Sequence, residues 1–583
     1  MEKKWLVLIV LLGVLLRFII ASNVTPVADE MVHATHAMGI AALQPLSTLT
    51  QCPLWFYLTD FAYLLFDVTL FSSRFLAFFF GSLSIILTFM IGKLLFDTKK
   101  GVVAAFLLAI STFHIGWMTA YMDEAMMFFI LFAIYYFIKE YKESGKISII
   151  ASIFLGIAIQ IKIITFVFSV IFCLFIIFLL WENYKTDTKK FKINLKRAII
   201  FALILLVSCI PLFVYNWFLY QEKGIVDLPF SLYFDINREY YQGPGLSHEN
   251  GFVLANFPTT LYQIITSFFI RTDPVLFFLG LLGLPLVYRE YKKNKFTIGF
   301  MVVISIFAFL FIAASVVLPN HFTSFCPFLA LSGSLFLVFC TDKLKTKYPH
   351  VPFLKIILIL CLLFSLYYLS NGLTTKSATD KMRGFAIESI GDKDLVVVDS
   401  RIYRGTIAWM FNDKHYLESA TFPEVFNLQQ NSQKKIPVTT WFIECVPDDC
   451  GWGTIKDQPD FNKSTEDLFD LFRNASTLKE IFEGGGDLSP IKGGERPGAY
   501  YKVYQATLPL DAGIVSAVDQ THSMFFYEVR RNKHPEQAFD YYSIKGPMSK
   551  LAHALGYVVL YFYILLALLS PFYLAYIFKK EYH

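Results

Sequence analysis

The sequence predicts a polytopic α-helical membrane protein with a mixed α/β domain outside the membrane, on two observations. First, 56% of the 583 residues are hydrophobic and only 17% are charged. Soluble globular chains carry about 25% charged residues, and disordered chains carry more charge and fewer apolar residues, so composition excludes both classes. Second, apolar runs long enough to cross a bilayer recur along the chain, separated by basic loops or by long polar segments.

Apolar runs of roughly 17 to 25 residues mark the membrane helices, because this length crosses the hydrocarbon core. Residues 147–181 are too many for one span, and Gln160 and Lys162 interrupt them, so we expect two spans joined by a very short turn. The first run is not followed by the cleavage site of a signal peptide, so it is expected to remain as a span. About twelve transmembrane helices result, at approximately residues 4–22, 72–95, 101–117, 125–138, 147–161, 163–181, 198–220, 274–288, 297–318, 325–340, 354–370 and 551–578.

Basic residues predict the orientation of these spans. With the N-terminus in the cytoplasm, every short basic loop falls on the cytoplasmic side, as the positive-inside rule requires. We therefore expect a plasma-membrane protein with both termini cytoplasmic, whose net charge of +5 reflects topology rather than a nucleic-acid surface. The basic loops contain Lys99–Lys100, Lys139–Lys146, Lys185–Arg197, Arg289–Lys295, Lys343–Lys347 and Lys579–Lys580.

Three long segments then fall outside the cytoplasm, at residues 23–70, 221–273 and 371–548. The third is long enough for a core of its own, and its short β-branched or aromatic runs indicate strands. We expect strands at 394–399, 440–443 and 499–504 and a helix at 465–483. The predicted domains are the membrane domain 1–370, the outer α/β domain 371–548, and a final span with a cytoplasmic tail at 549–583.

Cys445 and Cys450 lie close together in this outer domain. A local disulfide is favoured over two free thiols, because disulfides persist outside the cytoplasm. A zinc site would need further Cys or His ligands at suitable spacing, and none is adjacent.

Two pairs of acidic residues face the outer side close to the membrane, where carboxylates are costly unless they have a role. Asp29-Glu30 follows the first span within a few residues, and the pattern after it indicates an interfacial helix that begins at the acids. Asp123-Glu124 lies at the mouth of the fourth span. Such carboxylates serve as general base, metal ligand or orienting group, whereas the competing interpretation is that each pair only caps a helix.

Further motifs accompany the acidic pairs in a specific order. They are Cys52-Pro53-Leu54-Trp55-Phe56-Tyr57, Ser73-Arg74-Phe75-Leu76, Tyr121-Met122-Asp123-Glu124-Ala125, Leu155–Lys162 and His321–Pro327. Together with Asp29-Glu30 they resemble the GT-C superfamily of membrane glycosyltransferases, in particular its protein O-mannosyltransferase and aminoarabinose-transferase branch. The resemblance covers roughly residues 1–370 and gives this part the expected role of catalytic domain. Cys52-Pro53 replaces the usual Pro-Pro, and the Trp-Trp-Asp-Tyr-Gly hallmark of oligosaccharyltransferases is absent, which argues against transfer of a whole oligosaccharide to Asn.

The resemblance implies inverting transfer of a sugar from a polyprenyl-phosphate donor to a protein, lipid or glycan acceptor. Such a donor has a good leaving group, so the reaction needs a base for the acceptor and cations for the departing phosphate, but no general acid. Asp29 is expected to be the base or to orient it, with Glu30 beside it. Asp123 or Glu124 would assist by positioning the acceptor or, with Asp29, by holding a divalent metal ion if one is used.

The topology places several cations at the same outer face. Arg74 is expected either to contact the substrate or to be an interfacial residue that snorkels. Residues 233–256 form either a mobile lid or a plain surface loop, and residues 258–269 an amphipathic helix on the membrane. The expected phosphate contacts are Lys162, Arg238, Arg271 and His321.

Two other classes of protein compete with this prediction. A transporter or channel also has about twelve spans, but its two similar halves and midplane ionisable residues are not evident here. A sensor or assembly scaffold that carries the outer domain would not need paired acids at two loop mouths, and it remains open only if the acids are helix caps.

Overall fold

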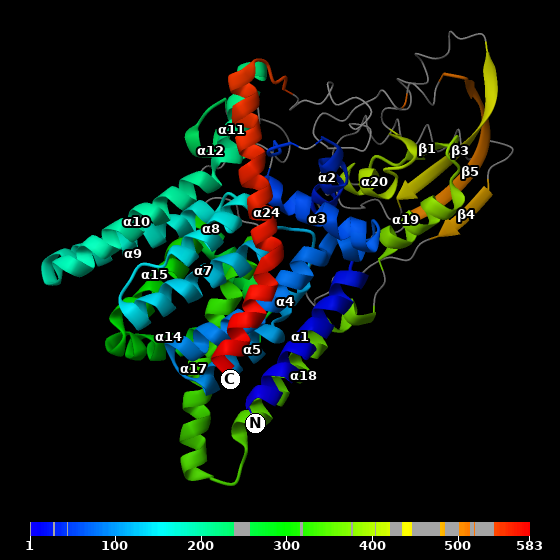
Figure 1. Cartoon of the computed structure of the whole chain (residues 1–583). Helices are drawn as coiled ribbons and strands as arrows, with labels where there is room; N and C mark the ends of the chain where they lie inside the picture. The colour runs from blue at the N-terminus through cyan, green and yellow to red at the C-terminus, as the bar shows by residue number, and fades with distance from the viewer. Residues whose placement is uncertain are drawn as a thin grey trace.

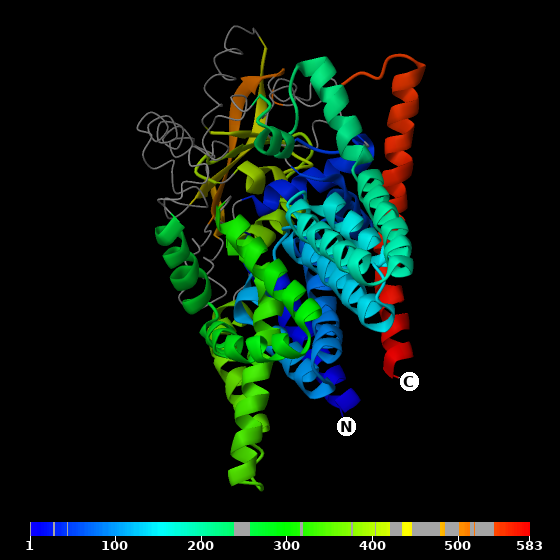
Figure 2. The same ribbon diagram turned by 90° about the vertical axis from the view of Figure 1, so that its left-hand side faces the viewer.

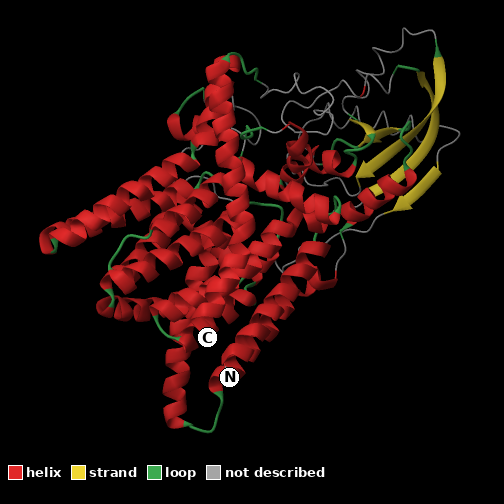
Figure 3. Cartoon of the chain, in the orientation of Figure 1, coloured by secondary structure: helices red, strands yellow, loops and turns green. Residues whose placement is uncertain are grey.

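The chain forms a bundle of long tilted helices with a small sheet at one end (Figures 1 and 3). The computed structural model describes residues 2–26, 29–43, 45–49, 51–237, 257–314, 319–374, 377–402, 404–419, 434–445, 479–483, 501–513, 518 and 542–582. Both termini lie at the end of the bundle opposite the sheet, in two views at right angles (Figures 1 and 2).

Each of the twelve predicted apolar runs falls mostly in one helix or in two consecutive helices, and residues 315–318, at the end of the run 297–318, lie outside the described part of the chain. The polytopic helical fold class is therefore confirmed. The helices are α1 (Glu2–Asn23), α4 (Leu70–Leu95), α5 (Thr98–Ala109) with α6 (Thr112–Gly116), α7 (Asp123–Ser144), α8 (Ile149–Ile161), α9 (Thr165–Thr186), α10 (Thr188–Ser208) with α11 (Ile210–Lys223), α14 (Pro274–Lys293), α15 (Lys295–Ala314), α17 (Cys326–Lys347), α18 (Phe353–Thr374) and α24 (Pro547–Tyr582).

By length and composition alone, fewer than twelve helices qualify as complete spans. Among the described residues, nine are long and apolar enough to cross a membrane, or ten if α10 and α11, bent by 42°, make one span. Of the remaining two predicted spans, α8 has only 13 residues, and α7 carries charged residues in its first and last turns. Helix α7 is nevertheless the centre of the bundle, because every residue from Asp123 to Ile138 is buried.

The predicted break within residues 147–181 is present. Helix α8 ends at Ile161, and Lys162 follows in an extended conformation before α9 begins at Thr165. The carbonyl oxygen of Ala158 accepts from the backbone nitrogen of Lys162 at 2.9 Å and from the hydroxyl of Thr165 at 3.0 Å, so both sides of the turn are tied to the last turn of α8. This turn presents Lys162 at the mouth of the bundle.

Small residues allow the closest helix contacts. A Cβ atom at Gly92 of α4 would lie 2.8 Å from Cα of Gly101 in α5, and one at Gly283 of α14 would lie 2.0 Å from the carbonyl oxygen of Ser332 in α17. Such contacts between backbones are typical of membrane helices, where dispersion forces rather than the hydrophobic effect hold helices together.

Short helices cover the end of the bundle that carries the sheet. They begin with α2, which starts at Glu30 and confirms the expected helix at the first acidic pair. Residues 258–269, expected as one amphipathic helix, form α13 and a following π-helix. The short helices are α2 (Glu30–Leu43), α3 (Pro53–Phe66), α12 (Leu228–Phe234), α13 (Phe257–Gln263), the π-helix Ile264–Ile270, α16 (Pro319–Phe322), a 3₁₀ turn (Thr323–Phe325), α19 (Ala378–Ser389) and α20 (Arg404–Met410).

The sheet is mixed, in the strand order β2-β1-β3-β5-β4. Strand β1 is parallel to β2 and β3, whereas β5 is antiparallel to β3 and β4. The strands expected at 394–399 and 440–443 correspond to β1 and β3, and the described part of 499–504 lies in β5. The strands are β1 (Leu395–Val398), β2 (His415–Glu418), β3 (Lys435–Cys445), β4 (Lys479–Glu483) and β5 (Tyr501–Asp511).

The helix predicted at 465–483 is wrong over its last residues. Lys479–Glu483 is strand β4, paired with β5 through Lys479 opposite Gln505. Lys and Glu favour helices in isolation, but a free strand edge offers backbone hydrogen bonds that local propensity does not anticipate. Residues 465–478 lie outside the described part of the chain.

The sheet and its helices rest directly on α2. Met31 and Ala34 of α2 share one buried cluster with Val396 of β1 and Trp409 of α20. Gly405 of α20 approaches α2 so closely that a Cβ atom there would lie 2.7 Å from the backbone nitrogen of Val32. Helix α20 thus packs on the helix that begins at the first acidic pair.

Candidate active site

Arg74 and Glu30 form a buried ion pair at the start of α2. Two guanidinium nitrogens of Arg74 contact the two carboxylate oxygens of Glu30, with 3.0 Å from Nη2 to Oε2. Arg74 also donates to the carbonyl oxygens of Ala21 at 3.1 Å and Val24 at 2.6 Å, and the backbone nitrogen of Ala120 donates to Glu30 Oε1 at 2.8 Å. The pair therefore joins the end of α1, the starts of α2 and α4, and the loop before α7.

Asp29 and Glu30 are adjacent in the sequence but differ in their exposure to solvent. Both Glu30 and Arg74 are 0% exposed, whereas Asp29 is exposed in the turn before α2. Arg74 therefore does not snorkel, and its guanidinium is occupied by protein acceptors. Asp29 is the member of the first acidic pair that is accessible to an acceptor.

Asp123 faces Lys162 and Asn320. The ammonium of Lys162 donates to Oδ1 and Oδ2 of Asp123 at 2.8 and 2.9 Å, and Nδ2 of Asn320 donates to Oδ2 at 2.8 Å. His321, the neighbour of Asn320 on α16, stabilises the charged form of the Asp123 carboxylate electrostatically. The structure therefore brings three sequence-predicted residues together and adds Asn320, which no sequence motif singled out.

Glu124 points into a different network. Nε2 of His114 lies 2.8 Å from Oε2 of Glu124, and Nη2 of Arg17 lies 3.1 Å from Nδ1 of His114. Arg17 also donates to the carbonyl oxygens of Leu108 at 2.9 Å and Ala109 at 3.1 Å. Sequence reasoning missed Arg17 and His114, although an Arg inside the first apolar run is itself a signal, because a charge there requires a partner.

Two buried histidines, His33 and His36, lie on α2 just after the first acidic pair. The ring of His33 lies 5.6 Å from that of Tyr121 and 6.4 Å from that of His36, and both histidines are buried. Within the described residues, Nδ1 of His33 has no hydrogen-bond partner. Neither histidine was predicted from the sequence, although both lie in the segment that follows Asp29-Glu30.

The electrostatics of His33 place the charged groups in one site. The pKa of the His33 imidazole is lowered from 6.5 to about 4; burial is the main cause, Lys162 acts in the same direction, and Asp29, Asp123 and Glu30 oppose it. Asp29 in the turn before α2, Asp123 in the first turn of α7 and Lys162 just after α8 therefore all act electrostatically on the same imidazole.

The remaining sequence-predicted residues are Arg271, Arg238 and the two cysteines of the outer domain. Arg271 is exposed at the end of the π-helix, where its backbone nitrogen donates to the carbonyl of Thr266 at 3.0 Å. Arg238 and most of the proposed lid at 233–256 lie outside the described residues. Cys445 is disulfide-bonded, whereas Cys450 lies outside the described residues, so this pairing stays a prediction.

The described residues do not fit a divalent metal ion. No group of three or more His, Cys, Asp or Glu side chains in the described ranges has the arrangement of a metal site. Lys162 contacts both oxygens of Asp123, and a cation in that position repels a metal ion. No step of the reaction is therefore assigned to a metal held by Asp29 and Asp123.

One family model of glycosyltransferases matches part of the chain. Residues 50–212 match the family model of dolichyl-phosphate-mannose-protein mannosyltransferase, a range that includes Arg74, Asp123 and Lys162. None of the curated proteins matches the chain in sequence.

Two solved structures are similar in fold to most of the chain. ArnT from Cupriavidus metallidurans, bound to undecaprenyl phosphate, has a TM-score of 0.53 at 11% identity, over 86% of this chain and 98% of ArnT. The apo oligosaccharyltransferase of Archaeoglobus fulgidus has a TM-score of 0.51 at 12% identity, over 87% of this chain and 88% of that one. The chain is therefore a multi-pass membrane protein with the GT-C fold, and its predicted resemblance to the GT-C mannosyltransferase-like proteins is confirmed.

Proposed function

We propose that this protein is an inverting glycosyltransferase that moves a sugar from a polyprenyl-phosphate donor to a protein, lipid or glycan acceptor. One observation carries the proposal: in a chain of GT-C fold, exposed Asp29 and the Asp123–Lys162 ion pair act on the same buried imidazole of His33. The family model over residues 50–212 and the undecaprenyl phosphate bound to ArnT support the class of donor. The sugar and the acceptor are not specified by these observations.

Asp29 is assigned the role of general base. Its carboxylate accepts the proton of the acceptor as the acceptor atom attacks the anomeric carbon. The bond between that carbon and the phosphate oxygen breaks, and its electron pair leaves with the polyprenyl phosphate. A single displacement of this kind inverts the anomeric configuration. A positioned base contributes typically about 10²- to 10⁴-fold in rate.

Lys162 and His321 are assigned to the departing phosphate. The negative charge on the phosphate grows as the bond breaks, and cations fixed beforehand at that position stabilise it without reorganisation. Asp123 accepts hydrogen bonds from Lys162 and from Asn320 of α16. These two bonds fix the position of the Lys162 ammonium relative to α16. The geometry thus favours Asp123 over Glu124 as the second acid of the site.

The site lies at the end of the bundle that carries the sheet, away from both termini (Figure 1). Together with the basic loops, this supports an extracytoplasmic reaction with both termini in the cytoplasm. We assign catalysis to residues 1–370 and infer that the outer domain 371–548 limits access to the site, since α20 packs on α2.

Transfer from a panel of radiolabelled polyprenyl-phosphate sugars by the purified protein tests this proposal. The wild type is expected to turn over at least one donor, and Asp29→Asn to lose about 10²-fold or more of that rate. Asp67→Asn is the matched control, because Asp67 is also exposed at a helix end, between α3 and α4 in the sequence, and its positive φ of 57° suits Asn. Turnover is expected to persist in a chelator.

The outcomes of this assay distinguish a transferase that uses Asp29 from a transporter. Full activity of Asp29→Asn would remove Asp29 from the mechanism. Failure of every donor, with binding or movement of a solute that does not depend on Asp29, would replace the transferase by a transporter.

A further inference from the structure

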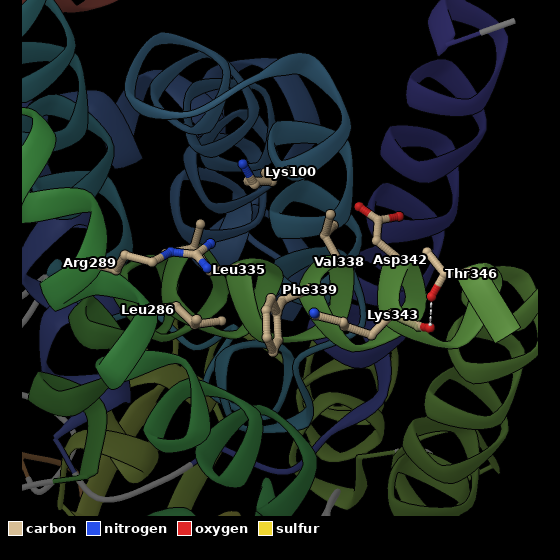
Figure 4. A pocket seen from close by; sticks show the side chains of 9 residues that line it. All are labelled: Lys100, Leu286, Arg289, Leu335, Val338, Phe339, Asp342, Lys343 and Thr346. Carbon is tan, nitrogen blue, oxygen red and sulfur yellow. Dashed lines mark hydrogen bonds between the residues drawn. The ribbon is translucent and has the colours of Figure 1, made fainter.

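A pocket of about 320 Å³ lies at the end of the bundle that holds both termini, far from the site described above. It is formed by the start of α5 and the ends of α14 and α17 (Figure 4). This volume falls at the lower end of the range of ligand sites.

The pocket has an apolar floor and a cationic rim. Leu335 and Val338 are buried at 3% and 4% exposure and form part of the floor. Lys100, Arg289 and Lys343 line the rim. An apolar floor next to a charged rim matches an amphiphile rather than a fully soluble ion.

Phe339 organises two of these cations. Cζ of Arg289 lies 5.4 Å and Nζ of Lys343 lies 6.0 Å from the centre of the Phe339 ring, and Figure 4 shows the ring between the two side chains. Cations at this distance are held by the ring face. The two positive charges are thus kept close together although they repel each other.

The carboxylates nearby do not neutralise this pair. Asp342, on the pocket wall, has its carboxylate 2.5 Å from the ammonium of Lys99. Glu290 lies 2.9 Å from Lys293 but 3.8 Å from Arg289. Within the described residues, Lys343 forms no ion pair with a carboxylate, so the rim keeps an excess of positive charge.

We propose that this pocket binds a phosphate ester, and specifically the headgroup of an anionic phospholipid whose acyl chains leave along α14 and α17. Arg289 and Lys343 contact the phosphate oxygens, and Leu335 and Val338 contact the first carbons below it. Basic pockets between membrane helices on the cytoplasmic side are typical sites for such headgroups. The site is independent of the proposed transfer reaction.

Lipid binding to the full-length protein in detergent tests this proposal. Phosphatidylglycerol, phosphatidylcholine and glycerol 3-phosphate are titrated and bound molecules are counted by native mass spectrometry. Arg289→Gln/Lys343→Gln is expected to weaken phosphatidylglycerol binding about five-fold for each cation removed. Lys292→Gln/Lys345→Gln, which removes the same charge from the same two helices outside the pocket lining, is expected to leave binding unchanged.

Each outcome of this experiment either supports or overturns the proposed lipid site. Preference for phosphatidylglycerol over phosphatidylcholine, lost only in the pocket variant, supports the lipid site. Displacement of the lipid by glycerol 3-phosphate at equal concentration assigns the same pocket to a soluble phosphate ester. Equal losses in both double variants, or no preference for the anionic lipid, overturns the proposal. If the pocket variant unfolds, Phe339→Leu takes its place, because it releases both cations without changing the charge.

Discussion

Asp123 and Glu124 are adjacent in the sequence, yet their carboxylates belong to separate networks. Asp123 accepts from Lys162 at 2.8 Å and from Asn320 at 2.8 Å, whereas Glu124 lies 2.8 Å from the His114 ring that Arg17 contacts. Consecutive residues at a helix start differ by about 100° around the axis. One acid therefore faces the candidate active site and the other faces the packing between α1, α6 and α7.

Because of this difference, we expect two conservative substitutions to affect different properties of the protein. Asp123→Asn is expected to lower the rate of sugar transfer about 10²-fold, because Lys162 loses the carboxylate that positions it. Glu124→Gln is expected to lower the thermal unfolding temperature while the folded protein keeps most of its transfer rate. Transfer assays and thermal unfolding of both variants test this, and a stable but inactive Glu124→Gln protein would reverse the two roles.

Breaking the Glu30–Arg74 pair is expected to destabilise the protein. Both side chains are 0% exposed, and removal of one partner from a buried pair costs about 3–5 kcal/mol because the other charge stays buried. Arg74→Met and Glu30→Gln should therefore each lower the free energy of unfolding, and Glu30→Leu/Arg74→Met should lower it less than either.

Denaturant unfolding of the three variants measures this. Lys99→Met is the control, since the Lys99–Asp342 pair is 44% and 56% exposed and such surface pairs contribute at most about 1 kcal/mol. A cost for Arg74→Met no larger than that of the control would contradict a buried pair.

The contact between α20 and α2 is expected to transmit changes from the outer domain to the site. In Gly405→Ala the new Cβ would lie 2.7 Å from the backbone nitrogen of Val32, so α20 and α2 must move apart. Overpacking of this kind costs about 1–3 kcal/mol, and the rate of transfer should fall because α2 carries His33 and begins directly after Asp29.

Gly384→Ala in the neighbouring helix α19 is the matched control. A Cβ atom at Gly384 meets nothing within 4 Å, and Ala is favoured over Gly in a helix by about 1 kcal/mol. Thermal unfolding and transfer assays should show a loss only for Gly405→Ala; equal behaviour of the two variants would mean that α20 yields without disturbing α2.

His33 is expected to make stability depend on pH. Its pKa is about 4 in the folded protein, against 6.5 ordinarily, so the unfolded chain binds more protons between these values. The contribution of neutral His33 is therefore complete above pH 6.5 and is lost as the pH falls toward 4. Thermal unfolding across this range should show a smaller decline for His33→Gln than for the wild type. The exposed His350, replaced in the same way, should leave the decline unchanged, and parallel curves for all three proteins would refute this role of His33.

Local patterns in the sequence determined the elements of this protein. Length and apolarity determined the position of the twelve helical runs, because a membrane helix must satisfy its backbone within itself. The polar interruption at Gln160 and Lys162 determined the turn between α8 and α9, and Asp29-Glu30 marked the start of α2. The charge and position of Asp29, Glu30 and Lys162 were also enough to predict which end of the bundle carries the candidate catalytic residues.

Only the tertiary structure decided which of these residues meet. It paired Arg74 with Glu30, separated Asp123 from Glu124, brought Asn320 and His33 into the site, and made residues 479–483 a strand against β5. The reason is physical: a helix or strand is specified by neighbours along the chain, whereas a partner for a buried charge or a strand edge is supplied by residues far away in sequence. Packing of distant elements alone selects that partner.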